Sequence, residues 1–260
     1  MTHATGAPVG AAIAVRLSAN GYQVFGTSRS GVPEGARFEL LRLDVTDDAS
    51  VTACVGDVLR RAGRIDVLVN NAGVSMIAAF EDATVAQARA MFETNVFGAM
   101  RMTAAVLPSM RERRSGRIVN ISSVAGLIPT PFCSLYGATK HALEGFSESL
   151  DHELRSVGIR SILIEPGFTR SRIQENALRP DAPLDFYAED RRNMEEVFSD
   201  LMAKAPDPDV VASTVLKALG DRDPSVRYPV GREAALLARL RRFLPTSVFE
   251  RSFRKQFRLD

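Results

Sequence analysis

The sequence predicts one α/β domain of the doubly wound type, a three-layer α/β/α arrangement with a parallel sheet of about seven strands. Apolar segments with strand character alternate along the chain with helical patterns, as in folds built from parallel strands and crossover helices. Residues 65–69 form an apolar, β-branched run that is typical of a buried parallel strand. Gly6 and Gly10 precede an apolar helical pattern, and 260 residues suit a single domain.

The other elements follow from the same patterns. We expect strands at residues 22–27, 37–43, 65–69, 117–121, 159–165 and 227–230. We expect helices at residues 47–62, 84–113 and 136–157, and one that starts at Asp207 with Pro208 in its first turn. Asp47 or Asp48 lies near the cap of the first helix, and Thr84 and Gln87 form a capping-box pattern. With no repeat, linker or second domain, residues 1–260 are predicted to form one unit.

The composition is that of an ordinary globular protein, with 45% hydrophobic and 25% charged residues. The formal net charge of +2 and the absence of a clear basic stripe give no indication of nucleic-acid binding. Cys54 and Cys133 make no disulfide framework and show no metal-ligand spacing, so small buried residues are the preferred interpretation and no metal is expected. No apolar run has the length of a membrane span and no signal peptide is evident, so a cytoplasmic protein is the default expectation.

Three residues indicate proton transfer to or from an oxygen atom. Tyr136 and Lys140 are four residues apart, so on a helix their side chains lie on one face, one turn apart. A free tyrosine has a pKa of about 10, and a nearby cation lowers that pKa. Lys140 can therefore make Tyr136 a usable acid or base, while the Ser123 hydroxyl holds the reacting oxygen. An exposed tyrosine–lysine pair on a helix surface is the alternative interpretation.

Two further segments have the character of ligand-binding turns. The glycines of Thr5-Gly-x-x-x-Gly10 open a helical pattern, and glycine lets a backbone approach a pyrophosphate at the positive end of a helix. Asn70-Asn-Ala-Gly73 follows the strand at residues 65–69, where open α/β sheets bind ligands. Each motif by itself is also compatible with an ordinary turn.

The set of motifs is more specific than any single member. Thr5-Gly-x-x-x-Gly10, Asn70-Asn-Ala-Gly73, Asn95, Ser123, Tyr136-x-x-x-Lys140 and Pro166-Gly167 occur in one order with compatible spacings. That combination resembles the short-chain dehydrogenase/reductase family over about residues 5–230. The resemblance implies a Rossmann-type fold and hydride transfer between a nicotinamide and a carbonyl or alcohol carbon. Residues 147–154 and 165–170 look like the branch that contains 17β-hydroxysteroid and retinol dehydrogenases.

The resemblance also assigns roles at the site. Tyr136 would be the general acid/base, and Lys140 would in addition bind the nicotinamide ribose. Ser123, selected over Ser122 by the family's spacing to the tyrosine, would position the substrate oxygen. Asn95 would support a water-mediated proton path, although a polar residue that caps or kinks a helix is its alternative role. The implied cofactor site is Gly6, Pro8, Gly10, Ala11, Ser28, Arg29, Asp44, Val45, Asn71, Ala72, Gly73, Tyr136, Lys140, Pro166, Gly167 and Thr169.

The end of the second strand predicts which dinucleotide is bound. An acidic residue that holds the ribose 2′-hydroxyl of NAD lies there in dinucleotide folds. This chain has Ser28 and Arg29 instead, and an arginine can pair with a 2′-phosphate and stack on adenine. We therefore expect NADP(H). Asp44 matches the family's adenine-contacting aspartate and could instead cap a helix.

The substrate is expected to be apolar. In the resembled family, substrate pockets lie at the positions that here hold Met76, Phe132, Leu135 and Phe168, together with Ser123 and Tyr136. A hydrophobic ketone, aldehyde or secondary alcohol fits such a pocket, and residues 168–205 are expected to form a mobile lid. A 3-oxoacyl-thioester reductase and a non-catalytic NADP(H)-binding regulator are the alternatives.

Two departures from the family pattern and the carboxyl-terminal tail complete the predictions. Ala11 and Ala12 follow Gly10 where Ile and Gly are usual, with a modest expected effect. Only four residues precede Thr5, too few and too polar for a full central strand, which predicts reduced stability or cofactor affinity. The basic tail with Phe243, Phe249, Phe253 and Phe257 is expected to pack against the domain or a subunit rather than a membrane. Family members are commonly dimers or tetramers whose subunits meet through the two long helices that include Asn95 and Tyr136. The resemblance therefore implies a homodimer or homotetramer.

Overall fold

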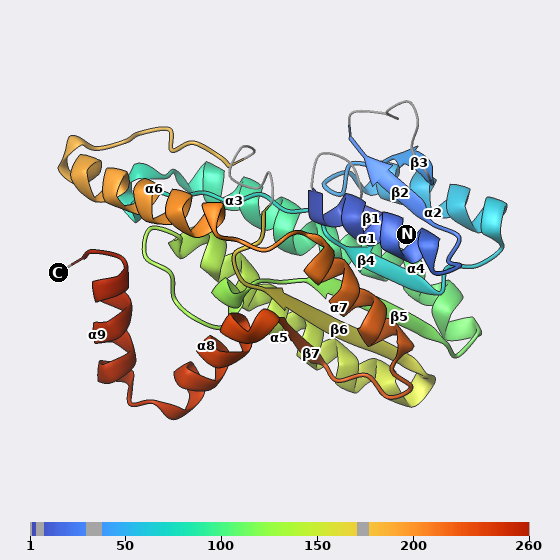
Figure 1. The fold of residues 1–260 in the computed structure, drawn as a ribbon. Coiled ribbons are helices and arrows are strands. Elements are labelled where there is room, and N and C mark those ends of the chain that lie inside the picture. The colour runs from blue at the N-terminus through green and yellow to red at the C-terminus, as the bar shows by residue number, and fades with distance from the viewer. Residues whose placement is uncertain (1, 4–7, 30–37, 171–176, 260) are drawn as a thin grey trace.

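The structure, a computed structural model, describes residues 2–3, 8–29, 38–170 and 177–259. Its centre is a seven-stranded sheet in which all paired strands are parallel, in the order β3-β2-β1-β4-β5-β6-β7 (Figure 1). The strands are β1 (Thr2–His3), β2 (Phe25–Ser28), β3 (Glu39–Arg42), β4 (Val67–Asn70), β5 (Gly116–Ile121), β6 (Ile159–Pro166) and β7 (Arg227–Val230). The predicted doubly wound fold is confirmed. The strand order reverses between β1 and β4, which is where open sheets of this kind bind ligands.

Helices cover both faces of the sheet. They are α1 (Pro8–Ala19), α2 (Asp48–Ala62), α3 (Val85–Phe92), α4 (Gly98–Glu112), α5 (Ser134–Leu154), α6 (Ala188–Ala203), α7 (Asp209–Gly220), α8 (Gly231–Phe243) and α9 (Thr246–Gln256). Neighbouring residues of one strand point to opposite faces. Val69 therefore packs with α1 and α7, whereas Leu68 packs with α2, α4 and α5 (Figure 1).

Local capping sets the helix starts that the sequence predicted. Asp47 caps α2, where its carboxylate accepts hydrogen bonds from the backbone N–H groups of Ala49 and Ser50. Thr84 and Gln87 form the complete capping box of α3. Asp207 and Pro208 precede α7 rather than lying in its first turn, because the helix begins at Asp209. The predicted helix at 84–113 is interrupted by a π-helical turn, Glu93–Phe97, between α3 and α4.

The described part of the central strand β1 is two residues long, and it lies between β2 and β4. Thr2 pairs with Gly26 of β2 and with Val69 of β4. The predicted strands at 22–27 and 65–69 begin at Phe25 and Val67, where pairing with Glu39 of β3 and with Arg117 of β5 starts. A cavity of about 460 Å³ lies at that end of the sheet, and Val24, Ile65 and Asp66 are among its lining residues.

The predicted lid and the predicted tail each contain a helix, and these helices lie at one end of the molecule (Figure 1). The predicted lid, 168–205, contains α6, and the predicted tail contains α9 (Figure 1). Phe249 and Phe257 are buried, which confirms packing against the domain for these two rings. Phe243 differs: it ends α8, is 77% exposed and lies against the Arg242 guanidinium. None of the helices described is both long and apolar enough to cross a membrane.

Candidate functional site

Most of the predicted site residues lie along the carboxyl edge of the sheet. Pro8, Gly10 and Ala11 lie in the first turn of α1, and Gly6 lies outside the described residues. The others lie at or just after the ends of strands: Ser28 and Arg29 (β2), Asp44 and Val45 (β3), Asn71, Ala72 and Gly73 (β4), Ser123 (β5), and Pro166, Gly167 and Thr169 (β6). Parallel strands end at the same edge of a sheet, so residues far apart in sequence meet there.

Ser123, Tyr136 and Lys140 come together at this edge. Tyr136 lies in the first turn of α5 and Lys140 one turn further along, because Ser134–Leu154 is a continuous helix. Lys140 Nζ lies 5.6 Å from the centroid of the Tyr136 ring and donates a hydrogen bond to Ile121 O at 2.9 Å. Ser123 is the second residue after β5, and its hydroxyl is hydrogen-bonded to Tyr136. The exposed surface pair considered as an alternative is therefore wrong: Lys140 is buried.

Burial dominates the electrostatics of the pair. Burial raises the pKa of Tyr136 to about 12, and the hydrogen bond with Ser123 only partly opposes this rise. Burial also lowers the pKa of Lys140 to about 8, against the opposing charge of Glu144. The expected lowering of the Tyr136 pKa is thus wrong for the protein without a ligand. The Lys140 ammonium lies beside the Tyr136 ring and donates a hydrogen bond to Ile121 O. A phenolate at Tyr136 would be buried away from the water that stabilises its charge, and this raises the pKa.

Asn95 sits in the π-helical turn and joins two parts of the edge. Its side-chain amide accepts a hydrogen bond from Val74 N and donates one to Val74 O, both at 2.8 Å. It also donates to Thr139 Oγ1 on α5 at 3.0 Å. Asn95, which is 2% exposed, therefore holds the loop after β4 against the helix that carries Tyr136. π-helical turns of this kind occur frequently at functional sites.

The two adjacent serines point to different partners. Ser122 is buried and lies against Glu144, where it partly opposes the rise that burial causes in the pKa of that carboxyl group. Ser123 instead reaches Tyr136. The structure thus brings the serine selected by sequence spacing, and not its neighbour, to the phenol.

A charged network behind Lys140 was missed from sequence. Arg227 of β7 binds the Glu144 carboxylate and donates to Glu165 Oε1 at 2.7 Å and to Glu148 Oε1 at 2.9 Å. Burial is the main cause that raises the pKa of Glu144 to about 7, and the nearby Glu165 carboxylate adds to it. The position of Glu144 one turn beyond Lys140 was the available signal, but Arg227 comes from a distant segment.

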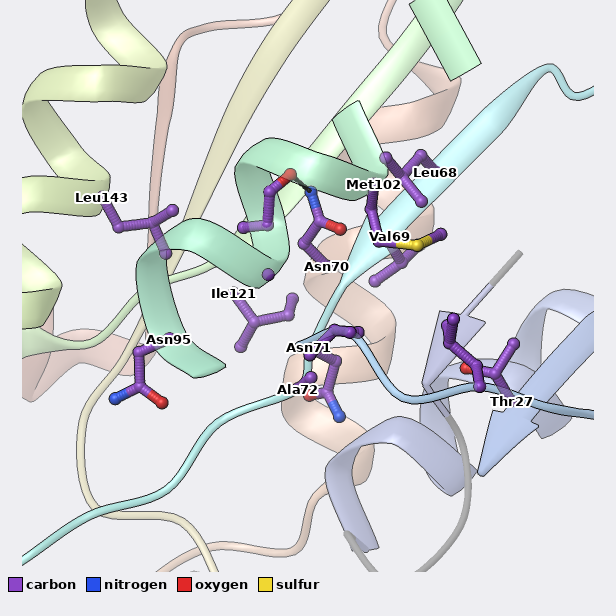
Figure 2. A pocket seen from close by; sticks show the side chains of 14 residues that line it. Thr27, Leu68, Val69, Asn70, Asn71, Ala72, Asn95, Met102, Ile121 and Leu143 are labelled. Atoms are coloured by element: carbon purple, nitrogen blue, oxygen red, sulfur yellow. Dashed lines mark hydrogen bonds between the residues drawn. The ribbon is translucent and has the colours of Figure 1, made fainter. Parts of the chain in front are cut away.

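The cofactor side of the edge is built from short turns. Asp44 accepts hydrogen bonds from Thr46 N at 2.9 Å and from Thr46 Oγ1 at 2.7 Å, so it stabilises a turn and leaves the helix cap to Asp47. Figure 2 shows a small cavity at the switch point, around which Thr27, Asn71, Ala72 and Asn95 are arranged. Strands β2, β4 and β5 and the π-helical turn thus share one space.

The substrate side is apolar around Tyr136. Met76 and Leu135 belong to one apolar cluster that contacts Tyr136, together with Met91. Phe132 and Phe168 belong to a second cluster on the ring, together with buried Cys133 and residues of α6 and α9. All four apolar residues that were predicted from sequence to lie near the substrate therefore belong to the two clusters that Tyr136 joins.

Comparison with known proteins agrees with this geometry. Residues 3–182 match the family described as short chain dehydrogenase. The 3-ketodihydrosphingosine reductase of Bacteroides thetaiotaomicron is 32% identical over 92% of this chain and 90% of its own length. Retinol dehydrogenase 8 of Bos taurus is 35% identical over 84% of this chain and 77% of its own length.

A solved structure extends the likeness to the whole molecule. A short-chain dehydrogenase from Streptomyces avermitilis is similar with a TM-score of 0.82 and 34% identity, over 99% of this chain and 94% of that one. The alternating fold, the meeting of Ser123, Tyr136 and Lys140, and these matches lead to one conclusion. This chain belongs to the short-chain dehydrogenase family of oxidoreductases.

Proposed function

We propose that the protein is an NADP(H)-dependent oxidoreductase that transfers a hydride between the nicotinamide and a hydrophobic ketone, aldehyde or secondary alcohol. The observation that carries this proposal is the meeting of Ser123, Tyr136 and Lys140 between two apolar clusters. A proton donor, a hydroxyl and a cation there face an apolar space at the ligand-binding edge.

The chain offers features that fit a dinucleotide. Gly10 is buried in the first turn of α1, whose amino end suits a phosphate. A side chain on Gly73 would place its Cβ 3.4 Å from Asn95 Oδ1 and 4.0 Å from Lys140 Nζ. Because Gly73 has no side chain, the nicotinamide ribose can approach the backbone beside the Lys140 ammonium closely. Pro166, Gly167 and Thr169 would line the nicotinamide end.

The roles of the residues follow from their chemistry. When bound, the cofactor supplies or accepts the hydride. Ser123 holds the substrate oxygen by a hydrogen bond, and Tyr136 gives its proton to that oxygen in reduction or accepts it in oxidation. Lys140, with a pKa of about 8, is mostly charged at neutral pH and stabilises the phenolate that reduction leaves behind. Asn95 supports the proton path from the side of the loop after β4.

The pKa of Tyr136 favours one direction at neutral pH. A phenol whose pKa burial raises to about 12 is protonated there, so it is ready to donate. Reduction of a carbonyl needs a proton donor and oxidation needs a proton acceptor. We therefore expect carbonyl reduction to be the faster direction near pH 7, with oxidation rising at alkaline pH.

Two observations support NADP(H) over NAD(H). The residues at the end of β2 are Ser28 and Arg29, and neither of these two described residues has a carboxylate that could hold a 2′-hydroxyl or repel a 2′-phosphate. Arg29 is exposed, so its guanidinium can pair with a phosphate. NADH that binds as tightly as NADPH in a titration would refute this preference.

The apolar lining supports a hydrophobic substrate. Met76, Phe132, Leu135 and Phe168 contribute carbon atoms to the clusters about Tyr136. The names of two relatives, 3-ketodihydrosphingosine reductase and retinol dehydrogenase 8, refer to apolar molecules and support the same class. A 3-oxoacyl-thioester is a second candidate for the same chemistry.

The test combines binding with turnover. NADPH should raise the melting temperature, and NADPH absorbance should fall when steroid, retinoid, aliphatic, aromatic or 3-oxoacyl-thioester carbonyls are added. Tyr136→Phe should lower kcat at least about 100-fold and leave NADPH binding intact, because only the proton donor is lost. Tyr22→Phe is the matched control, since Tyr22 is exposed at the opposite end of the sheet.

Each outcome separates the alternatives. Undiminished turnover in Tyr136→Phe would refute the mechanism. NADPH binding without turnover of any carbonyl by the unaltered protein would favour the non-catalytic regulator. Homodimer or homotetramer formation stays a prediction, which the mass in solution tests.

A further inference from the structure

The last helix of the chain reaches the site from outside. Phe257 follows α9, is 2% exposed and packs with Met194 and Phe198 of α6. The Phe198 and Phe257 ring centroids are 6.1 Å apart, and those of Phe253 and Phe257 are 4.8 Å apart. Tyr136 packs against this same cluster, so the tail and the proposed proton donor share one apolar space.

The contact continues from the tail to the strand edge. Phe198 lies edge-on to Phe168, with ring centroids 5.4 Å apart and planes at 71°. Phe168 lies directly after Gly167, in the segment that leaves β6. A chain of rings therefore runs from Phe257 through Phe198 to Phe168, and Tyr136 packs against the cluster that contains them.

These rings are not part of the main cores. The two large clusters on the faces of the sheet contain no residue of α8 or α9, as far as the structure describes them. The match to the family also ends at residue 182, before α6, α8 and α9 begin. The aromatic residues of the tail therefore pack outside the cores on the two faces of the sheet.

A salt bridge on the outside joins the two helices of this cover. Arg258 donates to Glu196 of α6 at 3.2 Å, and both side chains are more than half exposed. A pair with this exposure contributes little to stability. The rings beneath it must therefore carry most of the attachment between α6 and the tail.

We propose that Phe257 and Phe253 form the outer wall of the substrate site and select a carbonyl or alcohol that bears a bulky apolar group. This inference rests on the proposed function and names the part of the chain that sets substrate size. The apolar group packs against these rings and Phe168, with its oxygen toward Tyr136 and Ser123. A short carbonyl reaches Tyr136 without touching the wall.

Cys133 gives the wall a reporter that does not depend on turnover. This thiol is buried in the same cluster as Phe257, and burial raises its pKa to about 12. Such a thiol reacts slowly with maleimides because the reactive thiolate is scarce and water is excluded. Cys54 lies in the cluster between α2 and the sheet, so Cys54→Ser leaves Cys133 as the single thiol.

The first experiment compares Phe257→Ala with Phe243→Ala, an exposed phenylalanine of the preceding helix. With NADPH, Phe257→Ala should raise KM for dodecanal about tenfold, the effect of losing much of one aromatic contact. KM for butanal and kcat for both aldehydes should stay within about twofold, because the reacting atoms keep their partners. Phe243→Ala should match the unaltered protein.

The second experiment measures N-ethylmaleimide labelling of Cys133 in the Cys54→Ser protein. Dodecanal should slow the labelling of Cys133. Adding Phe257→Ala should speed the labelling about tenfold or more, and dodecanal should slow the labelling of this variant less. Phe257→Leu, which keeps apolar volume, supplies the same comparison if the alanine variant does not fold.

The two experiments distinguish the possible failures. The proposed wall would be overturned if Phe257→Ala changed KM equally for dodecanal and butanal, changed neither KM, or lowered KM for dodecanal. Labelling that neither Phe257→Ala nor dodecanal alters would also overturn it. No turnover of either aldehyde by the unaltered protein, with labelling that dodecanal slows, would instead refute the proposed reaction and retain the apolar site.

Discussion

The attachment of the lid helix α6 depends on a buried carboxylate that a single atom change can test. Asp82 is fully buried and accepts hydrogen bonds from Leu184 N at 2.8 Å and from Arg191 Nη1 at 2.5 Å. Asp82→Asn keeps the size of the side chain and an oxygen for Leu184 N–H. It replaces the charged oxygen that faces the guanidinium of α6 by an NH2 group, so the charge and the hydrogen bond from Arg191 are lost together.

The size of the effect follows from the burial of the pair. Removing one partner of a buried ion pair costs about 3–5 kcal/mol, because the other charge stays without compensation. Arg191 is 16% exposed and can regain some water, so we take the lower value of about 3 kcal/mol. For a chain of this length each kcal/mol lowers the melting temperature by about 2–4 °C, which gives a decrease of about 6–12 °C at pH 7.

The direction of the Asp82 pKa shift determines how the effect of Asp82→Asn changes with pH. Burial pushes the pKa of Asp82 up, but the Leu184 N–H group and Arg191 outweigh it, so the pKa in the folded protein is below its usual value. The contribution of Asp82 is therefore complete above the unfolded pKa of about 3.9 and is lost as the pH falls through the lower folded pKa. The difference in melting temperature between the two proteins should shrink over that acidic range.

The assay is thermal unfolding followed by circular dichroism from neutral to acidic pH. Glu196→Gln is the control on the same helix, because its bridge to Arg258 is exposed and is expected to contribute less than about 1 kcal/mol. A change below about 1 °C for Asp82→Asn at pH 7, or a difference that grows on acidification, would refute the reasoning.

Two further predictions concern the edge and the centre of the sheet. A Cβ on Gly98 would lie 2.7 Å from Val45 Cγ2, so Gly98→Ala should lower the free energy of unfolding by about 1–3 kcal/mol and weaken NADPH binding. Gly145 has open space around the position of a Cβ, so Gly145→Ala should be neutral or slightly stabilising. Calorimetry and NADPH titration measure both variants, and equal effects would contradict the packing argument. Adding four apolar β-forming residues before Met1 should raise the melting temperature, because they would continue β1 into the cavity between β2 and β4. An unchanged melting temperature together with unchanged NADPH affinity would show that the short strand suffices.

Local patterns in the sequence determined much of the fold. The capping box of Thr84 and Gln87 needs only residues within one turn, and it forms as predicted. Strand β7 has the predicted bounds, Arg227–Val230, and Tyr136 and Lys140 share one helix face because helical periodicity is a local property. Each of these features depends on neighbours in sequence, which the sequence lists directly.

Other features required the tertiary structure. The starts of β2 and β4 were predicted too early, because a strand begins only where a neighbouring strand pairs with it, here at Glu39 of β3 and at Arg117 of β5. The π-helical turn at Asn95 lies within a pattern that reads as continuous helix. No local signal connects Phe257 with Tyr136, which only the folding of the tail onto α6 brings to one cluster.

The sequence by itself therefore determined the order of elements, the family and the identity of Ser123, Tyr136 and Lys140. Only the tertiary structure decided how these groups are charged and enclosed. The pKa of Tyr136 is raised rather than lowered because burial removes the water that would solvate a phenolate. Burial and the approach of distant segments are properties of the packed chain, and neither can be read from the spacing of residues along it.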